Sequence, residues 1–307
     1  MQIGMIGLGK MGANMVRRLS GGGHDVVAFD VSPESRQVLM DEGIEVASSL
    51  EDLVARLRPP RVCWVMVPAG DPTRSTVSAL GTILSSGDVV VDGGNSNYKE
   101  APAQAAELAG AGISLVDAGV SGGIWGLTEG YCLMVGGDAD AVALVEPAFR
   151  TLAPEGGYAH VGPLGAGHFV KMVHNGIEYG MMQAYAEGFE LLGATDEFGL
   201  DLHEIAGIWR YGSVVRSWLL DLIERAIAPG AGFEKVRGVV ADSGEGRWTV
   251  EEGIERAVPT PVIAAALFAR FSSRQDDSFA ARLIAAQRNQ FGGHAVVTED
   301  APRGGAE

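Results

Sequence analysis

A glycine-rich turn near the start of the chain restricts its fold more than any other feature. The turn follows an apolar run at residues 2–6 and precedes residues 11–19, whose apolar spacing is helical. The pattern GxGxxG between a strand and a helix is typical of a dinucleotide-binding βαβ unit. Its glycines let the backbone approach a pyrophosphate, and the helix N-terminus offers N–H groups to the phosphates. We therefore predict a dinucleotide site at Gly7, Leu8, Gly9, Lys10, Met11 and Gly12.

An acidic residue ends the next strand-like run, at residues 25–30. Asp30 lies 18 residues beyond Gly12. A carboxylate at that place accepts hydrogen bonds from the adenosine ribose 2′-OH and repels a 2′-phosphate, which favours NAD over NADP. A glycine turn that merely opens an α/β domain is the alternative interpretation, and the strand, helix and acid around the turn argue against it.

The first half of the chain alternates strand-like runs with helical patterns. Further strand-like runs lie at residues 61–67, 89–92, 114–118 and 131–135. Ser32, Pro33 and Glu34 form a helix-start signal, and residues 101–111 form an alanine-rich helical pattern. This alternation predicts a Rossmann-like α/β domain, with a mostly parallel, doubly wound sheet and helices on both faces.

The character of the sequence changes after residue 163. Long helical patterns then dominate, at residues 169–192, 202–211, 214–228, 261–270 and 278–289. We predict an NAD-binding domain over residues 1–163 and an all-α domain over residues 164–307 for substrate binding and oligomerisation. We expect the last residues, TEDAPRGGAE, to fray because they are rich in glycine, proline and charge.

Composition excludes several classes of function. Lys and Arg number 23 against 39 Asp and Glu, a formal charge of −16, which argues against binding to nucleic acid or an anionic membrane. Cys63 and Cys132 cannot build a disulfide framework, and no CxxC or HExxH motif indicates a metal site. The start lacks a signal-peptide pattern, and no run approaches the roughly 20 apolar residues of a membrane span. We expect a cytoplasmic protein without a metal.

Three further turns follow strand-like runs. Ligands in open α/β sheets bind at the carboxyl ends of the strands. We therefore predict that Val67, Pro68 and Ala69 contact the cofactor, and that Asn95 bridges cofactor and substrate. The turn Ser121, Gly122 and Gly123 offers a hydroxyl and backbone N–H groups to a carboxylate. Tight turns without a ligand are the alternative in each case.

The first long helical pattern gathers unusual polar residues on one face. At spacings of three and four residues the face carries Lys171, His174, Asn175, Glu178 and Tyr179. Val170, Val173 and Ile177 occupy the opposite face, which we expect to pack against protein. A lysine base needs a pKa below its usual value of about 10.4, and a glutamic acid needs one above about 4.3. The pair suits chemistry with two proton transfers; a solvated face with a Lys–Glu pair is the alternative.

These motifs together resemble a known family. They are GLGKMGANM (7–15), VPAG (67–70), DGGNSNY (92–98), DAGVSGG (117–123), KMVHNGIEYGMMQ (171–183), ALFARFSSR (266–274) and QRNQFGGH (287–294). The chain resembles the decarboxylating 6-phosphogluconate dehydrogenases, specifically their short, NAD-preferring bacterial branch within the β-hydroxyacid dehydrogenase superfamily.

The resemblance implies a reaction and a role for each residue. The family oxidises C3 of 6-phosphogluconate without a metal, releases CO2 and forms ribulose 5-phosphate. Lys171 would be the base at the C3 hydroxyl, and Glu178 the acid that protonates C1. The residues that would hold the substrate carboxylate and hydroxyls are Asn95, Ser121, Gly122, Gly123, His174 and Asn175. Tyr179, Arg270 and Arg288 would bind the phosphate. Arg288 and His294 would reach a neighbouring subunit, which implies a homodimer or homotetramer.

Two departures from the family pattern bear on specificity. NADP-preferring members carry Asn-Arg-Thr where this chain has Asp30, Val31 and Ser32, so the arginine that meets a 2′-phosphate is missing. Longer members carry Lys-Gly-Thr-Gly-Lys-Trp where this chain places Ser243 and Glu245 at the first lysine and the threonine. Either Arg247 replaces that lysine, or the substrate is less anionic.

Two other functions remain as alternatives. One is a non-decarboxylating β-hydroxyacid dehydrogenase with a substrate similar to 3-hydroxyisobutyrate or gluconate. Glu178, Tyr179, Arg288 and His294 argue against it, because a simple dehydrogenase needs no second acid. The other is a non-catalytic NAD sensor, against which the intact pair Lys171 and Glu178 argues.

Overall fold

The computed structural model describes residues 1–298, so most of the end that we expect to fray lies outside the described residues. Contacts divide the chain into two units. Unit 1 comprises Met1–Ile177 together with Glu245–Glu255, and unit 2 comprises Glu178–Gly244 and the residues from Arg256 onward. The predicted domain boundary at residues 163 and 164 stays a prediction.

Unit 1 is built on a sheet of strands in the order β3-β2-β1-β4-β5-β6-β7-β8. All neighbouring strands run parallel except β6 and β7. The strands are β1 (Gln2–Ile6), β2 (Asp25–Phe29), β3 (Glu45–Val46), β4 (Val62–Val65), β5 (Val89–Asp92), β6 (Ser114–Ser121), β7 (Cys132–Gly137) and β8 (Tyr158–Gly162). The predicted Rossmann-like, mostly parallel sheet is confirmed. The strand order reverses between β1 and β4, the point where such sheets bind ligands.

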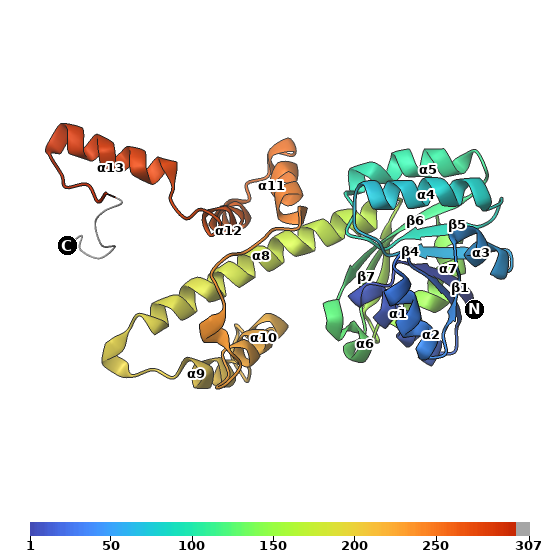
Figure 1. Ribbon diagram of the computed structural model, residues 1–307, viewed down its shortest axis with the longest axis horizontal. Helices are drawn as coiled ribbons and strands as arrows, with labels where there is room; N and C mark the ends of the chain where they lie inside the picture. The colour runs from blue at the N-terminus through green and yellow to red at the C-terminus, as the bar shows by residue number, and fades with distance from the viewer. Residues whose placement is uncertain (299–307) are drawn as a thin grey trace. The chain divides into compact units, whose positions relative to one another are not determined.

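Helices cover both faces of this sheet (Figure 1). One face carries α1 (Lys10–Gly21), α2 (Pro33–Asp41) and α7 (Ala139–Leu152), and the other carries α3 (Leu50–Arg56), α4 (Asp71–Ile83) and α5 (Ala101–Ala109). The short helix α6 (Gly126–Glu129) precedes β7. Each face has its own apolar core, with Met15 and Phe149 in one and Leu80 and Leu108 in the other. The doubly wound arrangement therefore rests on two separate clusters.

The long helix α8 (Ala166–Gly193) begins in unit 1 and packs closely on the sheet. A Cβ atom at Gly167 would lie 2.5 Å from the Met134 carbonyl oxygen, and one at Gly119 would lie 2.4 Å from Lys171 Cβ. Glycines at both positions therefore let the start of the helix reach strands β6 and β7. The predicted helix at residues 169–192 is confirmed and extends slightly at both ends.

Helix α11 (Glu245–Glu255) also belongs to unit 1 and packs against α8. The Thr249 hydroxyl donates to the Met172 carbonyl oxygen at 2.9 Å. A Cβ atom at Gly176 would lie 2.6 Å from Thr249 Cγ2, so the two helices approach as closely as a glycine allows. Residues more than seventy positions apart in the chain thus come into contact.

Every element that the structure describes in unit 2 is helical. Besides the second half of α8, unit 2 contains α9 (Leu202–Trp209), α10 (Trp218–Ala226), α12 (Pro261–Ser272) and α13 (Phe279–Gly292). Helix α10 begins later than predicted, because the Ser217 hydroxyl accepts a hydrogen bond from the Leu220 N–H and caps it. The short 3₁₀ turns of the chain are η1 (Tyr98–Glu100), η2 (Gly123–Trp125), η3 (Asp196–Phe198) and η4 (Phe233–Lys235).

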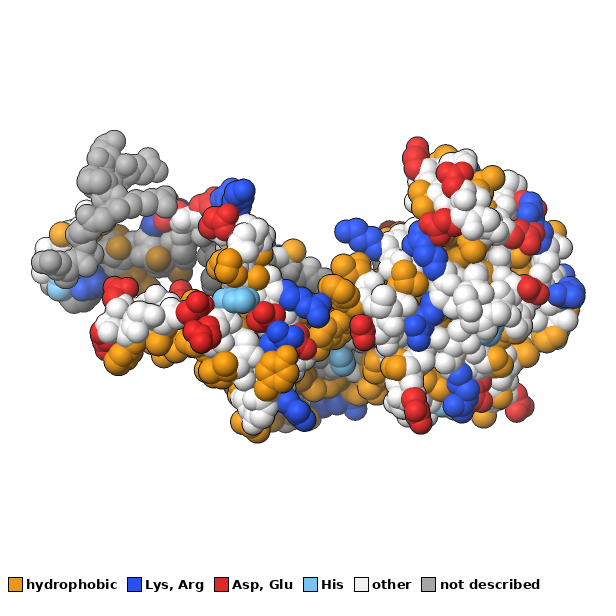
Figure 2. All heavy atoms as spheres, turned by 90° about the horizontal axis from the view of Figure 1, so that it is seen from below, with side chains coloured by type: hydrophobic (Ala, Val, Ile, Leu, Met, Phe, Trp, Pro, Cys, Tyr) orange, Lys and Arg blue, Asp and Glu red, His pale blue; other side chains and the backbone are white. Residues whose placement is uncertain are grey.

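Many large apolar side chains of unit 2 are exposed. Figure 2 shows apolar side chains on the surface of the protein. Val214, Leu191 and Phe279 of unit 2 are each more than 70% exposed. Exposed apolar surface of this extent is typical of a face that contacts another protein. No helix within residues 1–298 is long and apolar enough to cross a membrane.

Candidate active site

The predicted dinucleotide turn joins β1 to α1, and its three glycines serve different purposes. Gly7 has a φ of +98°, and a Cβ atom there would lie 2.4 Å from the Met66 carbonyl oxygen. A Cβ atom at Gly12 would lie 2.0 Å from the Gly7 carbonyl oxygen. A Cβ atom at Gly9, by contrast, would meet no protein atom within 4 Å. The space beside Gly9, which caps α1 without a side chain, is therefore open. A ligand phosphate could approach the helix N-terminus there.

Asp30 closes the other side of this turn. Its Oδ2 accepts a hydrogen bond from the Leu8 N–H at 2.6 Å, and its Oδ1 accepts one from the Ser32 N–H at 2.8 Å. The backbone of the turn thus fixes the carboxylate at the end of β2. Lys10 is exposed and Met11 is half-buried at the start of α1. These residues fit the pyrophosphate and ribose of a dinucleotide.

The loops after β4 and β5 lie side by side at the same edge of the sheet. A Cβ atom at Gly94 would lie 3.0 Å from the Val67 carbonyl oxygen. Pro68, Ala69 and Asn95 are exposed there, and Val67 is half-buried. Because β1, β2, β4 and β5 run parallel, the topology brings all the predicted cofactor residues to one edge.

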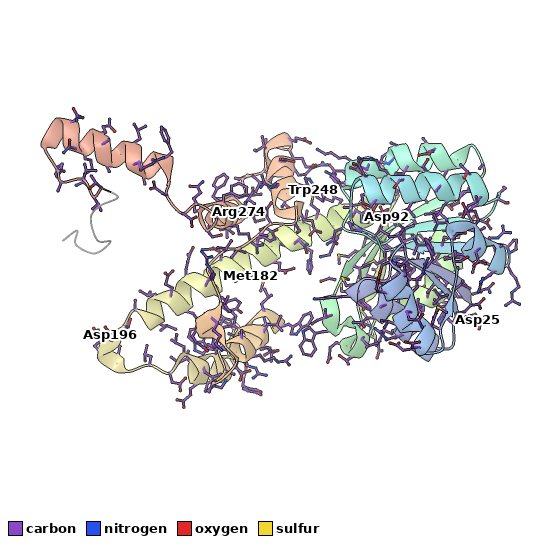
Figure 3. All side chains as sticks on the ribbon, in the orientation of Figure 1. Asp25, Asp92, Met182, Asp196, Trp248 and Arg274 are labelled. Carbon is purple, nitrogen blue, oxygen red and sulfur yellow. The ribbon has the colours of Figure 1, made fainter. Side chains whose placement is uncertain are left out.

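A buried charged network lies where α8 begins. His168 Nε2 lies 3.3 Å from Asp92 Oδ2, and both side chains are almost fully buried. Figure 3 shows Asp92 at the end of the sheet, beside the first turn of α8. Asp117, on β6, accepts hydrogen bonds from the Gly165 and His168 N–H groups, each at 2.7 Å. Carboxylates are favourable at a helix N-terminus, so this network fixes the start of α8.

The network shifts the pKa values of His168 and Asp92. Burial works against the charged form of His168, but the contact with Asp92 and the charges of Asp117 and Glu245 outweigh it and raise the pKa of His168. Burial likewise disfavours the charged form of Asp92, but His168 and other hydrogen bonds lower the pKa of that carboxyl. The pair is therefore stabilised in its ionised form.

Four of the predicted polar residues meet one turn beyond this network. Lys171 Nζ donates a hydrogen bond to Asn175 Oδ1, and His174 Nδ1 lies 3.0 Å from the same oxygen. Ser121 Oγ, at the end of β6, lies 3.5 Å from His174 Nε2. Gly122 and Gly123 follow with φ values of +134° and +53°, so this turn needs glycines. All of these residues belong to unit 1, as does the dinucleotide turn.

Sequence analysis did not place Glu245 in this cluster. The Asn175 Nδ2 group donates a hydrogen bond to Glu245 Oε2, and the Glu245 side chain is buried. The contact joins residues 70 positions apart, so no local pattern could predict it. The sequence marked Glu245 only as a departure from the family pattern.

Burial along α8 differs from the expectation. Val170 and Ile177 are 37% and 53% exposed, whereas Lys171 and Asn175 are 5% and 8% exposed. The prediction that the apolar face packs is therefore wrong for Val170 and Ile177, and Val173 is only half-buried. The physical reason is that β6, β7 and α11 cover the polar face.

Two of the predicted phosphate residues, Tyr179 and Arg270, lie together in unit 2. The Arg270 guanidinium lies 3.5 Å above the Tyr179 ring centroid, and Arg270 Nη1 donates to the Ala241 carbonyl oxygen at 3.1 Å. The Tyr179 hydroxyl accepts a hydrogen bond from the Ser243 N–H at 3.2 Å. Tyr179 and Arg270 are thus neighbours, as the phosphate prediction requires.

The remaining predicted residues are placed individually. Glu178 is half-buried on α8, seven residues after Lys171, and belongs to unit 2. Arg288 is exposed on α13, and His294 follows that helix, its carbonyl oxygen accepting a hydrogen bond from Asn289 at 2.9 Å. The roles of these three side chains stay predictions.

A doubly wound sheet with a dinucleotide turn, followed by a helix that carries a buried lysine, defines a nicotinamide-dependent dehydrogenase. The family model described as the NAD binding domain of 6-phosphogluconate dehydrogenase matches residues 2–162. The model described as the 6-phosphogluconate dehydrogenase C-terminal domain matches residues 167–280. The chain belongs to the 6-phosphogluconate dehydrogenase family.

Individual relatives agree with this assignment. The chain is 47% identical to Bacillus subtilis YqeC, provisionally named a 6-phosphogluconate dehydrogenase, covering 96% of this chain and 99% of that protein. It is 46% identical to a Haloferax volcanii protein named as an NAD(+)-dependent, decarboxylating 6-phosphogluconate dehydrogenase, covering 98% and 100% of the two chains. The solved 6-phosphogluconate dehydrogenase of Plasmodium falciparum is 26% identical with a TM-score of 0.83, covering 98% of this chain and 67% of that one.

Proposed function

We propose that this protein oxidises 6-phospho-D-gluconate at C3, with NAD as the oxidant, and releases CO2 and ribulose 5-phosphate. The observation that carries the proposal is the buried Lys171, hydrogen-bonded to Asn175 in the same unit as the NAD turn. The name of the Haloferax volcanii relative supports the same cofactor and reaction.

The cofactor would be held by the residues already described. The turn from Gly7 to Gly12 would bind the pyrophosphate, and Asp30 the adenosine ribose. Val67, Pro68, Ala69 and Asn95 would contact the nicotinamide side of the cofactor. When bound, NAD supplies the acceptor for the hydride that leaves C3.

The chain's own residues would supply the proton transfers. Neutral Lys171 takes the proton of the C3 hydroxyl as the hydride leaves C3, which produces a 3-keto acid and a protonated lysine. The lysine ammonium then polarises the C3 carbonyl, which accepts the electron pair released as the bond between C1 and C2 breaks and CO2 departs. The lysine ammonium gives its proton to that oxygen, which forms an enediol. Glu178 then protonates the enediol at carbon while Lys171 takes the hydroxyl proton back, and the product is ribulose 5-phosphate.

The remaining polar residues would orient the substrate. Asn95, the Ser121 turn with Gly122 and Gly123, His174 and Asn175 would hold the carboxylate and hydroxyls. Tyr179, Arg270 and Arg288 would bind the phosphate, since the planar guanidinium makes bidentate contacts with it. Arg288 and His294 would act in a neighbouring subunit of a homodimer or homotetramer, and the exposed apolar helices of unit 2 support such an assembly. The cytoplasmic location stays a prediction.

Replacing the lysine tests the proposal most directly. Lys171→Ala is expected to lower kcat by about 10²–10⁴-fold, the usual contribution of a positioned base, and to leave the Kd for NAD nearly unchanged. The assay follows NADH and released CO2 together, with 6-phosphogluconate or gluconate as substrate. Lys235→Ala, at an exposed lysine, is the matched control and should retain full activity.

Three outcomes would contradict the proposal. Full activity in Lys171→Ala would remove the lysine from the reaction. Loss of NAD binding in that variant would make Lys171 part of the cofactor site. NADH formation without CO2 in the wild-type protein would favour the non-decarboxylating dehydrogenase.

A further inference from the structure

We infer that Glu245 is a positioning residue, which orients the Asn175 amide so that its oxygen faces the Lys171 amine. The inference rests on the proposed function, because that function makes Lys171 the reacting base. It assigns a purpose to a carboxylate that the family pattern alone would place unfavourably near a phosphate.

The Glu245 carboxylate is held rigidly inside unit 1. The side chain is 2% exposed and lies in the first turn of α11, where a negative charge is favourable. The Thr249 hydroxyl lies 2.8 Å from the Glu245 carbonyl oxygen and 2.9 Å from the Met172 carbonyl oxygen. Because Gly176 lets α11 approach α8 closely, the backbone that carries Glu245 is held beside α8.

The contact determines which way the amide points. An asparagine side chain has one end that donates hydrogen bonds and one that accepts them. Nδ2 donates to the Glu245 carboxylate, so Oδ1 faces Lys171 Nζ and His174 Nδ1. A flipped amide would place Oδ1 against the Glu245 carboxylate, and two acceptor oxygens in contact repel each other. The contact with Glu245 therefore selects one of two amide orientations.

The selected orientation matters because Lys171 is only 5% exposed. A buried amine is oriented by its protein partner more than by water, and Asn175 Oδ1 is a partner that the structure shows. Misplacing a reacting group by about 1 Å can lower a rate on the order of 10²-fold. Glu245 would thus act on the rate through Asn175 without contacting the substrate.

The first test compares two substitutions of Glu245. Glu245→Met removes the acceptor at similar size and should lower kcat on the order of 10²-fold with the Kd for NAD unchanged. Glu245→Gln keeps an oxygen that accepts from Asn175 and should recover activity to within about tenfold of wild type. In an Asn175→Ala background, Glu245→Met should lower kcat by a further factor of less than about three. The reason is that the effects of two residues that act through one contact are not additive.

Several results would overturn the inference. Activity within about threefold of wild type in Glu245→Met would show that the orientation does not matter. An equal loss of kcat in Glu245→Met and Glu245→Gln would show that the charge or the packing of Glu245 matters, and not its hydrogen bond to Asn175. If Glu245→Met lowers kcat by the same factor in the Asn175→Ala background as in the wild-type protein, Glu245 does not act through Asn175.

A second measurement separates this inference from the proposed function. Acylation of Lys171 by acetic anhydride, read by peptide mass spectrometry with Lys235 as internal reference, needs no substrate. Glu245→Met should accelerate the labelling of Lys171, and Glu245→Gln should change it less. An inactive wild-type protein would refute the proposed function alone, whereas identical labelling in wild type and Glu245→Met would refute the positioning role.

Discussion

Removing His168 should destabilise the protein strongly, because it leaves Asp92 buried without its ion-pair partner. The two side chains are 1% and 3% exposed, and Nε2 lies 3.3 Å from Oδ2. Bulk water therefore does not solvate the carboxylate in the folded protein. The pair links the end of β5 to the first turn of α8, so its loss affects the position of Lys171 as well as stability.

The distance and burial set the magnitude of the loss. Two unit charges at the 3.3 Å separation of this pair attract by ~5 kcal/mol at an effective dielectric constant of about 20. Desolvation opposes this attraction, and breaking a buried pair by removing one partner typically costs about 3–5 kcal/mol. We expect His168→Ala to lower the free energy of unfolding by about 3 kcal/mol or more.

The loss should depend on pH with a definite sign. The pKa of His168 is raised in the folded protein, so its contribution is complete below the ordinary pKa of 6.5 and is lost as pH rises through the folded pKa. The pKa of Asp92 is lowered, so its contribution is present above its ordinary pKa of 3.8 and is lost as pH falls through the folded value. The advantage of wild type over His168→Ala should therefore be larger at about pH 6 than at about pH 9.

Urea unfolding followed by far-ultraviolet circular dichroism measures this difference. The matched control is His203→Ala, since His203 also contacts a glutamate at 3.0 Å but is 34% exposed. The control should lose less than about 1 kcal/mol, as partly exposed pairs do. A loss below about 1 kcal/mol in His168→Ala, or a loss that does not change with pH, would refute the reasoning.

Three further variants probe the cofactor turn and the helix contact. Gly9→Val should weaken NAD binding at least about tenfold without changing the urea midpoint, because its side chain meets ligand space and not protein; a changed midpoint would contradict this. Asp30→Asn combined with Val31→Arg should raise the ratio of kcat/KM for NADP over NAD by at least about tenfold, and an unchanged ratio would refute the specificity argument. Gly176→Ala should lower the free energy of unfolding by about 1–3 kcal/mol, since its Cβ atom would lie 2.6 Å from Thr249; a neutral effect in urea unfolding would show that α11 moves freely.

The sequence predicted the architecture of the N-terminal half well, because its signals are local. Strand β1 was predicted with its observed bounds, and the Ser32 hydroxyl caps α2 by accepting from the Ser35 N–H, as the Ser-Pro-Glu signal indicated. The spacing of GxGxxG and Asp30 likewise fixed the place of the dinucleotide turn. Each of these features depends on residues within one βαβ unit.

Features that depend on distant contacts were not predicted. Strand β8 (Tyr158–Gly162) is mostly exposed and short, so its apolar pattern is weak. Glu245 reaches Asn175 only because α11 folds back onto α8. Similarly, the Asp92 and His168 pair joins a strand end to a helix 76 residues later, and no local pattern reports such a contact.

The orientation of α8 shows most clearly what a periodic pattern leaves undetermined. Spacing identifies which side chains share a face, but burial depends on what packs against that face. Since a lysine is rarely buried without a partner, the general rule assigns a face with Lys171 and Glu178 to an open cleft and its opposite to the core. Here glycines at 119 and 167 bring the sheet against the polar face, and Asn175 provides a hydrogen-bond partner for the buried amine. A buried amine needs a hydrogen-bond partner, and an exposed amine does not. The burial of Lys171 beside Asn175 is therefore a stronger argument for chemistry at Lys171 than the spacing of polar residues in the sequence.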